Sequence, residues 1–321
     1  MGAEAIGVLV PVGPGAEEEE RLRALLDSVF AHEPDTGHVV LVDDGPSDRA
    51  LAAAIEVPDS TRLTVLANPR EGKGVPTLGG LCYATVAGLR HLALGTDARF
   101  VLRLDTDALV IAPFARRLDV AFGERPGVGA LGSYETVCNG HVRQFPAWEP
   151  ALRRLTRRVS IWRHPARRGR FLQLALAGRR GRVREEILAA LANGYRWGEH
   201  CQGGGYALNR PALDRMAAAG MLDDPLRWRD TRAGEDVMIG VLVRAAGLRL
   251  DGHVEPGEGL FAVAHSGLPL PPRQLLDGGY AIVHSVKRTE GWEEPELRAA
   301  LARSSPPPAA DRARAATSRR S

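Results

Sequence analysis

Cysteine is scarce in this sequence, and no apolar run is long enough to cross a membrane. The three cysteines, Cys82, Cys138 and Cys201, are widely spaced and odd in number, so they form neither a disulfide framework nor a zinc pattern. The apolar runs fall short of the roughly 18 residues that a membrane span needs. The first apolar segment, 6–12, follows no basic region and precedes no cleavage signal. These absences favour a reducing, cytoplasmic location and predict no transmembrane segment.

Most of the chain also lacks an excess of charge of one sign. The formal net charge is +3, but residues 302–321 alone carry five arginines against one aspartate, which leaves the rest near neutral. The exception is 151–184, which holds twelve arginines and no acid. This density suits either contact with phosphate or another anionic surface, or a solvated helical face. The segment contains no nucleic-acid-binding motif, so no nucleic-acid partner is expected.

The 321 residues do contain continuous apolar runs that alternate with amphipathic segments. The pattern predicts strands at 6–12, 38–42, 63–66 and 100–104, with helices at 17–30, 47–55 and 76–94 between them. Such an alternation predicts an α/β fold with a mostly parallel sheet, whose ligands bind beyond the carboxyl ends of the strands. In the second half we expect a strand at 128–134 and helices at 184–191, from 211, and at 235–246. Residues 304–321 are expected to be disordered.

Two carboxylates, Asp105 and Asp107, follow the apolar run 100–104 at alternate positions. If the chain stays extended through Thr106, both side chains point the same way. One could then bind Mg²⁺ or Mn²⁺ directly, while the other reaches the metal through water or holds a ribose hydroxyl. The alternative is an acidic turn that merely closes the strand.

Two further motifs are expected at the same edge of the sheet. Asp43 and Asp44 follow a buried strand and could cap the next helix or accept hydrogen bonds from a base or ribose. The segment 68–74 contains Arg70 and the glycine-flanked Lys73, which suit close approach to a pyrophosphate. It is not a Walker A loop, and it could equally be an ordinary flexible loop.

Three motifs of the second half could carry chemistry. Glu235 and Asp236 begin an apolar helix, where acids are favoured by the helix dipole and where a carboxylate could take a proton from a hydroxyl. The glycines of 203–205 could admit a sugar or another backbone, or form a tight turn. His265 ends an apolar run and is either a structural residue or a ligand suited to Mn²⁺.

Taken in order over about residues 5–267, these elements resemble the GT-A glycosyltransferases. The first half is similar to family 2 enzymes in the segments 10–12, 42–48, 72–74 and 105–107. The second half is similar to the beta-1,3-galactosyltransferase and fringe group in 201–208 and 235–240. The resemblance implies a Rossmann-like sheet with a helical insertion on the acceptor side. We expect a nucleotide-sugar-binding half at 1–135, an Arg-rich, mainly helical insertion at 136–200, and an acceptor-binding and catalytic half at 201–303.

The resemblance further implies a metal-dependent hexosyltransferase that moves one sugar, with inversion, from a nucleotide diphosphate sugar to a hydroxyl. A UDP-sugar donor is favoured, and the acceptor would be a soluble small molecule or glycan. Asp236 would be the general base. The donor would contact Pro11, Val12, Asp43, Asp44, Arg70, Lys73, Asp105 and Asp107, with Mn²⁺ or Mg²⁺ held by Asp105, Asp107 and His265. We expect acceptor contacts from Trp197, Gly204, Gly205, Tyr206 and Glu235.

Three other functions fit the same motifs. A sugar nucleotidylyltransferase would share the sheet and the metal-bound diphosphate, although its glycine- and arginine-rich first loop is absent after Val10. A retaining transferase is compatible with the two aspartates, because they do not set stereochemistry. A catalytically inactive protein could bind a nucleotide sugar in the same pocket. The Gln-x-x-Arg-Trp signature of processive synthases is missing, which favours a single transfer.

Overall fold

The computed structural model describes residues 6–46, 49–73, 79–157, 170–229, 231, 233–287, 289 and 291–302. Ser47, Asp48 and Gly74 of the expected donor motifs, and the tail predicted to be disordered, lie outside these residues. Within the described ranges, no helix is both long enough and apolar enough to cross a bilayer.

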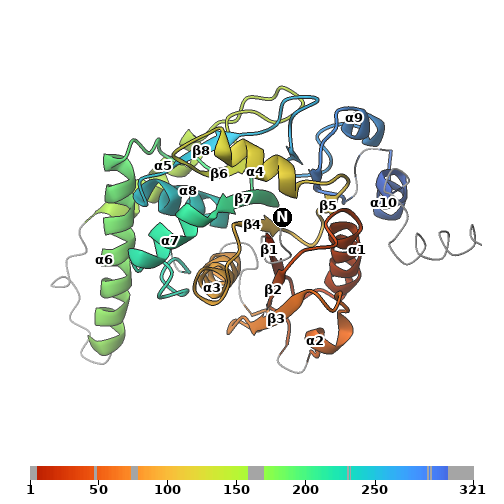
Figure 1. Cartoon of the computed structure of the whole chain (residues 1–321). Coiled ribbons are helices and arrows are strands. Elements are labelled where there is room, and N and C mark those ends of the chain that lie inside the picture. Colours follow the sequence, from red (N-terminus) through yellow and green to blue (C-terminus); the bar gives the residue numbers. More distant parts are fainter. Residues whose placement is uncertain are drawn as a thin grey trace, which may run out of the picture.

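A seven-stranded sheet forms the centre of the molecule, in the order β3-β2-β1-β4-β7-β6-β8 (Figure 1). Strand β7 is antiparallel to both of its neighbours, and every other neighbouring pair is parallel. The prediction of an α/β fold with a mostly parallel sheet is therefore confirmed. The strands are β1 (Ile6–Val12), β2 (His38–Asp43), β3 (Arg62–Ala67), β4 (Phe100–Leu104), β6 (Val128–Gly132), β7 (Gly205–Asn209) and β8 (Arg249–Gly252).

Helices cover both faces of this sheet. Successive residues of a strand point to opposite sides, so each central strand packs against both helical layers. In β1, Leu9 packs into one hydrophobic cluster, while Val8 and Val10 pack into the other. The first cluster includes residues of α3 (Gly79–Gly95), α7 (Arg210–Ala218) and α8 (Glu235–Ala245). The second includes residues of α1 (Glu17–His32), α2 (Leu51–Ala54) and α4 (Ala115–Gly123). The resulting three layers explain why β1, β2 and β4 are buried along their whole length.

A second, three-stranded sheet has the order β5-β10-β9. It consists of β5 (Leu109–Val110), β10 (Ile282–His284) and β9 (Phe261–Val263), with β10 antiparallel to β5 and parallel to β9. Its outer cluster is completed by α9 (Pro272–Asp277) and α10 (Glu294–Ala302). Strand β9 lies within the apolar run that precedes His265, whereas β5 and β10 were not predicted from the sequence.

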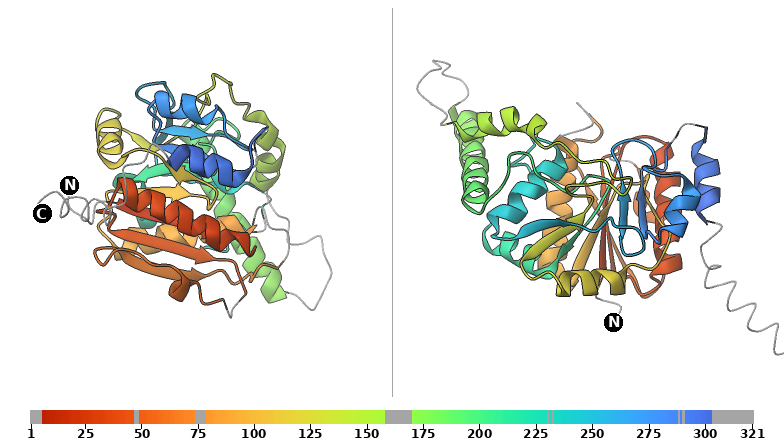
Figure 2. Two further views of the ribbon diagram at one scale, coloured as in Figure 1. Left: turned by 90° about the vertical axis from the view of Figure 1, so that its right-hand side faces the viewer. Right: turned by 90° about the horizontal axis from the view of Figure 1, so that it is seen from above.

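Helix α10 lies beside α1 at one end of the molecule (Figures 1 and 2). Arg21 of α1 donates hydrogen bonds to both oxygens of the Glu294 carboxylate, with Nε 3.0 Å from Oε1 and a terminal nitrogen 2.8 Å from Oε2. Arg298 of α10 also donates to Oε1, at 2.7 Å. These contacts join the start of the chain to its last described helix.

The segment expected to be a helical insertion contributes the 3₁₀-helix η2 (Pro146–Trp148) and the α-helices α5 (Glu149–Thr156) and α6 (Arg170–Ala192). Helix α6 contacts α5 and α8, and it lies at the end of the molecule away from α1 and α10 (Figures 1 and 2). The helix predicted at 184–191 lies within α6. The division of the chain into three functional parts stays a prediction.

Candidate functional site

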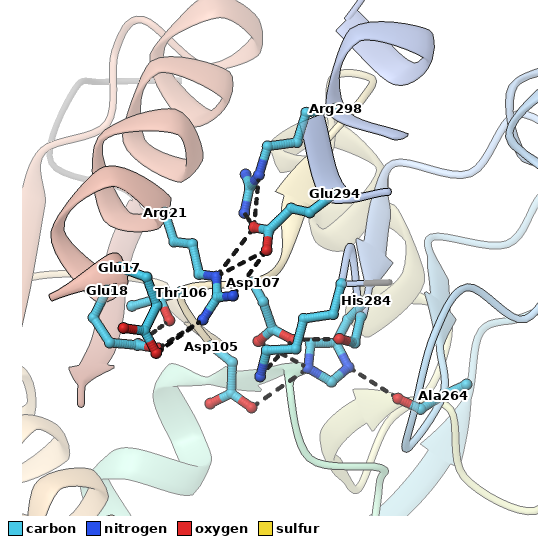
Figure 3. A network of polar contacts seen from close by, with 12 residues as sticks. Glu17, Glu18, Arg21, Asp105, Thr106, Asp107, Ala264, His284, Glu294 and Arg298 are labelled. Atoms are coloured by element: carbon cyan, nitrogen blue, oxygen red, sulfur yellow. Dashed lines mark hydrogen bonds and ion pairs between the residues drawn. The ribbon is translucent and has the colours of Figure 1, made fainter. Parts of the chain in front are cut away.

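Asp105 and Asp107 lie directly beyond the carboxyl end of β4, with His284 beside them (Figure 3). One ligand atom from each of the three residues lies within 4.8 Å of the other two. The His284 Nε2 atom is 3.5 Å from an oxygen of Asp105 and 3.3 Å from an oxygen of Asp107. The chain is not extended here but turns at Thr106, since the Ala108 N–H donates to the Asp105 carbonyl at 3.0 Å. The turn still aims both carboxylates at one histidine.

The pairing of β10 with β5 brings His284 to this place. Strand β5 begins two residues after Asp107, and Val283 of β10 lies opposite Leu109. Continuing that antiparallel register sets the end of β10 against Asp107, whose carbonyl accepts from the Val286 N–H at 2.8 Å. The Ser285 hydroxyl donates to the Asp107 carboxylate, and the half-exposed Lys287 Nζ is 3.2 Å from it. One short strand thus supplies several polar groups to the cluster.

Opposing effects set the charges in the cluster. Burial favours the neutral form of both carboxyls, but the positive Arg103 and His284 together lower the pKa of Asp105. Burial likewise opposes ionisation of Asp107, whose pKa is lowered by His284, Ser285 and Lys287. Burial alone would lower the pKa of His284, and its contacts with the two carboxylates instead raise it to about 9. Both carboxylates are therefore ionised.

The three residues fit a divalent cation, which would bind His284 in its neutral form and so displace the proton that the raised pKa retains. Two carboxylate oxygens and one imidazole nitrogen are ligands that Mn²⁺ accepts, and Mg²⁺ is bound through the oxygens. The ligand atoms of the three residues lie within 4.8 Å of one another, so small side-chain movements would let all three reach one ion. The His284 Nδ1 lies 2.9 Å from the Ala264 carbonyl, which fixes the ring and leaves Nε2 facing the carboxylates.

The histidine of the cluster is not the one that we expected from the sequence. His265 is exposed, beyond the end of β9, and is not part of the group formed by Asp105, Asp107 and His284. Both histidines follow an apolar run and precede a serine, so the sequence offered two similar candidates. The structure places His284 at the aspartates, because β10 rather than β9 pairs with β5.

The glycine segment before β7 makes room for the protein's own side chains. Gly204 has a φ of +96°, and a Cβ atom there would lie 2.4 Å from the His284 ring. A Cβ atom at Gly205 would lie 3.1 Å from Val263. We had expected an acceptor sugar to approach these glycines, but at Gly204 the space is taken by the imidazole. The segment therefore shapes the metal-ligand cluster.

Asp236 is tied to the same glycine segment. It lies in the first turn of α8, where its carboxylate accepts from the Val237 N–H at 2.8 Å and from the Gly203 N–H at 3.2 Å. The Gly204 carbonyl in turn accepts from the Asp105 N–H at 3.1 Å. The adjacent residues Gly203 and Gly204 thus bind Asp236 and the residue that follows β4, respectively.

The Asp236 carboxylate is ionised and partly accessible. Its side chain is 17% exposed, and one oxygen lies 3.2 Å from Nε2 of the buried His200. Although burial by itself raises the pKa of Asp236, the charge and hydrogen bond of His200 and the two backbone N–H groups lower it to about 2. The group can therefore accept a hydrogen bond from an incoming hydroxyl at any pH near neutrality.

Glu235 and Tyr206 are buried beneath the site, and we correct the expectation that they face an acceptor. The Tyr206 hydroxyl donates to the Glu235 carboxylate, which also accepts from Thr85 at 3.1 Å. Arg103 of β4 lies 3.4 Å from Glu235 and 2.7 Å from Asp105, and it is only 1% exposed. A guanidinium buried in the sheet requires negative partners. Glu235 and Tyr206 therefore support Arg103, which links Asp105 to the start of α8.

The aspartates expected to bind a base or ribose are each paired with an arginine. Asp43 accepts from the Gly45 N–H at 2.7 Å and lies 2.8 Å from Arg49. Asp44 pairs with Arg70, whose Nε is 3.1 Å from Oδ1. The Asp44 N–H donates to the Val12 carbonyl at 2.9 Å, so the ends of β1 and β2 lie together. The predicted meeting of these motifs at one sheet edge is thus seen in the structure.

The remaining expected contacts are dispersed. Pro11 is buried within β1. Lys73 is exposed and pairs with Glu71 at 2.8 Å. The central carbon of the Arg153 guanidinium lies over the Trp197 ring, 4.7 Å from the centre of that ring.

No protein-family model matches the chain, and no curated protein matches it in sequence. Among solved structures, it is similar to the mannosyltransferase PcManGT from Pyrobaculum calidifontis in complex with GDP-Man and Mn²⁺, with 18% identity over 78% of this chain and 55% of that chain, and a TM-score of 0.39. It is also similar to the apo structure of the bifunctional glycosyltransferase WbbM, with 12% identity over 95% of this chain and 50% of that chain, and a TM-score of 0.48. A third is S. aureus TarS 1-349, with 20% identity over 45% of this chain and 40% of that chain, and a TM-score of 0.31.

The chain spans about half the length of the first two of these proteins. With identities of at most 20% and TM-scores below 0.5, the three similarities assign neither a family nor an activity.

Proposed function

We propose that the protein is a metal-dependent GT-A glycosyltransferase, which moves a sugar from a nucleotide diphosphate sugar to an acceptor hydroxyl. The observation that carries this proposal is the placement of two chemical groups on one glycine segment. Gly203 donates to Asp236, and Gly204 accepts from Asp105 and lies against His284. A cluster of metal ligands and an ionised carboxylate are thereby held close together at the carboxyl edge of a mostly parallel sheet, where such sheets bind ligands.

Asp105, Asp107 and His284 would hold Mn²⁺ or Mg²⁺ on the diphosphate side of the site. When bound, such an ion offsets the charge that develops on a departing nucleoside diphosphate. Lys287 adds a positive charge next to Asp107, and because its side chain is 51% exposed it can turn toward a phosphate oxygen. Arg70 and Lys73 would face the same phosphates, with Pro11, Val12, Asp43 and Asp44 around the base and ribose. We favour UDP as the nucleotide.

Asp236 would act as the general base. Its oxygen would accept the proton of the acceptor hydroxyl as that oxygen attacks the anomeric carbon and the bond from this carbon to the phosphate oxygen breaks. Attack from the side opposite the phosphate inverts the configuration. His200 holds Asp236 in place from the buried side, and the N–H groups of Val237 and Gly203 help to keep it ionised.

A thermal-shift panel of nucleoside diphosphates, each with Mn²⁺ or with EDTA, tests the proposal and identifies the base. Asp107→Ala should abolish the Mn²⁺-dependent stabilisation, whereas Asp236→Asn should retain it and lose sugar transfer. Equal nucleotide binding by the two variants would contradict the assigned roles. Wild-type protein should also hydrolyse its donor slowly with Mn²⁺ when no acceptor is added.

Two product analyses separate this function from its alternatives. NMR of the product anomer distinguishes inversion from retention. Release of pyrophosphate from a nucleoside triphosphate and a sugar phosphate would instead indicate a nucleotidylyltransferase. Failure to hydrolyse any nucleotide sugar under any metal condition would indicate an inactive binding protein.

A further inference from the structure

A cavity of about 400 Å³ lies along α5, on the Arg-rich part of the chain. The charged residues that line it are three arginines and one glutamate, so the lining carries an excess of positive charge. The lining residues are Pro146, Glu149, Pro150, Arg153, Arg154 and Arg157. The function proposed above does not use this cavity.

The positive charge of the cavity is largely unneutralised. Arg153 pairs with Glu149 at 2.5 Å, and its guanidinium lies over the Trp197 ring. Arg154 and Arg157 are exposed, and neither forms an ion pair with any acid in the part of the chain that the structure describes. The adjoining segment 158–169 contains no aspartate or glutamate. Among the described residues, the two guanidinium groups of Arg154 and Arg157 therefore line the cavity without an acidic partner.

Trp148 connects this cavity to Asp236. It lies between the lining residues Pro146 and Glu149, and its ring is 3.4 Å from where a Cβ atom of Gly234 would be. The Asp236 carboxylate lies 2.6 Å from the same point. Helix α5 begins directly after Trp148, and its eight residues span about 12 Å. The helix that carries the cavity arginines therefore begins beside the residues that lead into Asp236.

We propose that this cavity binds a phosphate group of the acceptor, while Asp236 receives the proton of its reacting hydroxyl. The inference rests on the glycosyltransferase function proposed above. Guanidinium groups bind phosphate through paired N–H donors and remain charged at every physiological pH. Three arginines and one glutamate leave two positive charges, which matches a phosphate monoester with its charge of about −2 better than a single carboxylate. The acceptor is thus an extended phosphorylated molecule, soluble or attached to a lipid.

Titration of the full-length protein with inorganic tripolyphosphate tests this inference. EDTA and the Asp107→Ala background keep the probe from binding at the metal-dependent donor site. The test variant changes the three cavity arginines to glutamine, and a matched control changes three exposed arginines elsewhere, Arg90, Arg116 and Arg273. Both variants lose the same net charge, so only the local site differs.

We expect the cavity variant to bind tripolyphosphate at least about 10-fold more weakly than the control variant, because each arginine supplies charge-assisted hydrogen bonds. Equal losses in the two variants, or citrate binding as tightly as tripolyphosphate, would overturn the inference. In the wild-type background the cavity variant should keep Mn²⁺-dependent hydrolysis of the donor. If the wild type and both variants all fail to hydrolyse the donor, the glycosyltransferase function is refuted instead. The tripolyphosphate titration would still show whether the cavity binds phosphate.

A vesicle assay distinguishes the two sources of phosphate. The wild type is sedimented with vesicles of phosphatidylcholine alone and of phosphatidylcholine with phosphatidic acid at 3:1, because phosphatidic acid carries a phosphate monoester. Co-sedimentation that requires the anionic lipid and is lost in the cavity variant, but kept in the control, would support a lipid-attached acceptor. Tripolyphosphate binding without vesicle binding would support a soluble one.

Discussion

Replacing Gly204 by alanine tests the geometry of the metal-ligand cluster at one atom. The new Cβ would lie 2.4 Å from His284 Nδ1 and Cε1, about 1 Å closer than an ordinary carbon contact, so the imidazole must move. The φ of +96° adds a backbone penalty of about 1–2 kcal/mol for a residue with a side chain. Overpacking adds about 1–3 kcal/mol. We therefore expect Gly204→Ala to lower the free energy of unfolding by about 2–5 kcal/mol and to weaken Mn²⁺ binding.

Urea unfolding measures the first effect, and Mn²⁺-dependent thermal stabilisation measures the second. Gly140→Ala is the matched control, because Gly140 has a similar φ of +82° with no atom within 4 Å of its Cβ position. It should cost only the backbone penalty and leave Mn²⁺ binding unchanged. In a His284→Ala background, Gly204→Ala should cost no more than Gly140→Ala, since the ring that it strikes is gone. If Gly204→Ala cost as little as Gly140→Ala in the wild-type background, the imidazole could not lie where we describe it.

Three more outcomes are expected. His284→Ala should abolish Mn²⁺-dependent stabilisation by nucleotide, whereas His265→Ala should leave it intact; the reverse result would restore the assignment made from the sequence. Arg103→Met should lower the free energy of unfolding in urea by about 3–5 kcal/mol, because Glu235 would remain buried without its counter-charge, and a neutral result would contradict that network. Burial opposes ionisation of Glu294, yet hydrogen bonds from α1 and α10 lower its pKa, so Glu294→Gln should cost about 1 kcal/mol at pH 7. A carboxyl with a lowered folded-state pKa stabilises the fold above the unfolded value of about 4.3, and this contribution is lost as the pH falls through the folded-state pKa. The difference in urea unfolding between wild type and Glu294→Gln should therefore shrink below about pH 4. A difference that does not change with pH would contradict the pairing.

The central strands could be predicted because burial on two faces leaves a local signature. Continuous apolar runs predicted strands at 6–12 and 100–104, and β1 and β4 have those bounds. The helix predicted at 235–246 is α8, one residue shorter. In each case the pattern needed no knowledge of distant residues. The carboxyl edge of the sheet, and with it the meeting of Asp43, Asp44 and Asp105, followed from the parallel topology.

The third residue of the cluster could not be predicted in the same way. Strands β5 and β10 contain two and three residues, too few to show a period. What distinguishes His284 from His265 is that its strand pairs with the residues just after Asp107. That pairing joins segments far apart in the chain, and neither segment indicates its partner locally. The sequence did contain one further indication, Arg103 within an apolar strand. A buried arginine needs acidic partners, so this residue could have predicted that Glu235 is a buried counter-charge rather than an acceptor contact.

The completion of the cluster by β10 also has a consequence for the order in which the protein becomes functional during synthesis. Ser285 and Asp107 are in contact although 178 residues separate them. Chains emerge from the ribosome N-terminus first, and contacts of this separation close late because of their entropic cost. A nascent chain that ends near residue 280 already contains both aspartates and Asp236 but lacks the histidine that joins them. The three residues of the proposed cation site would therefore come together only after β10 has been synthesised.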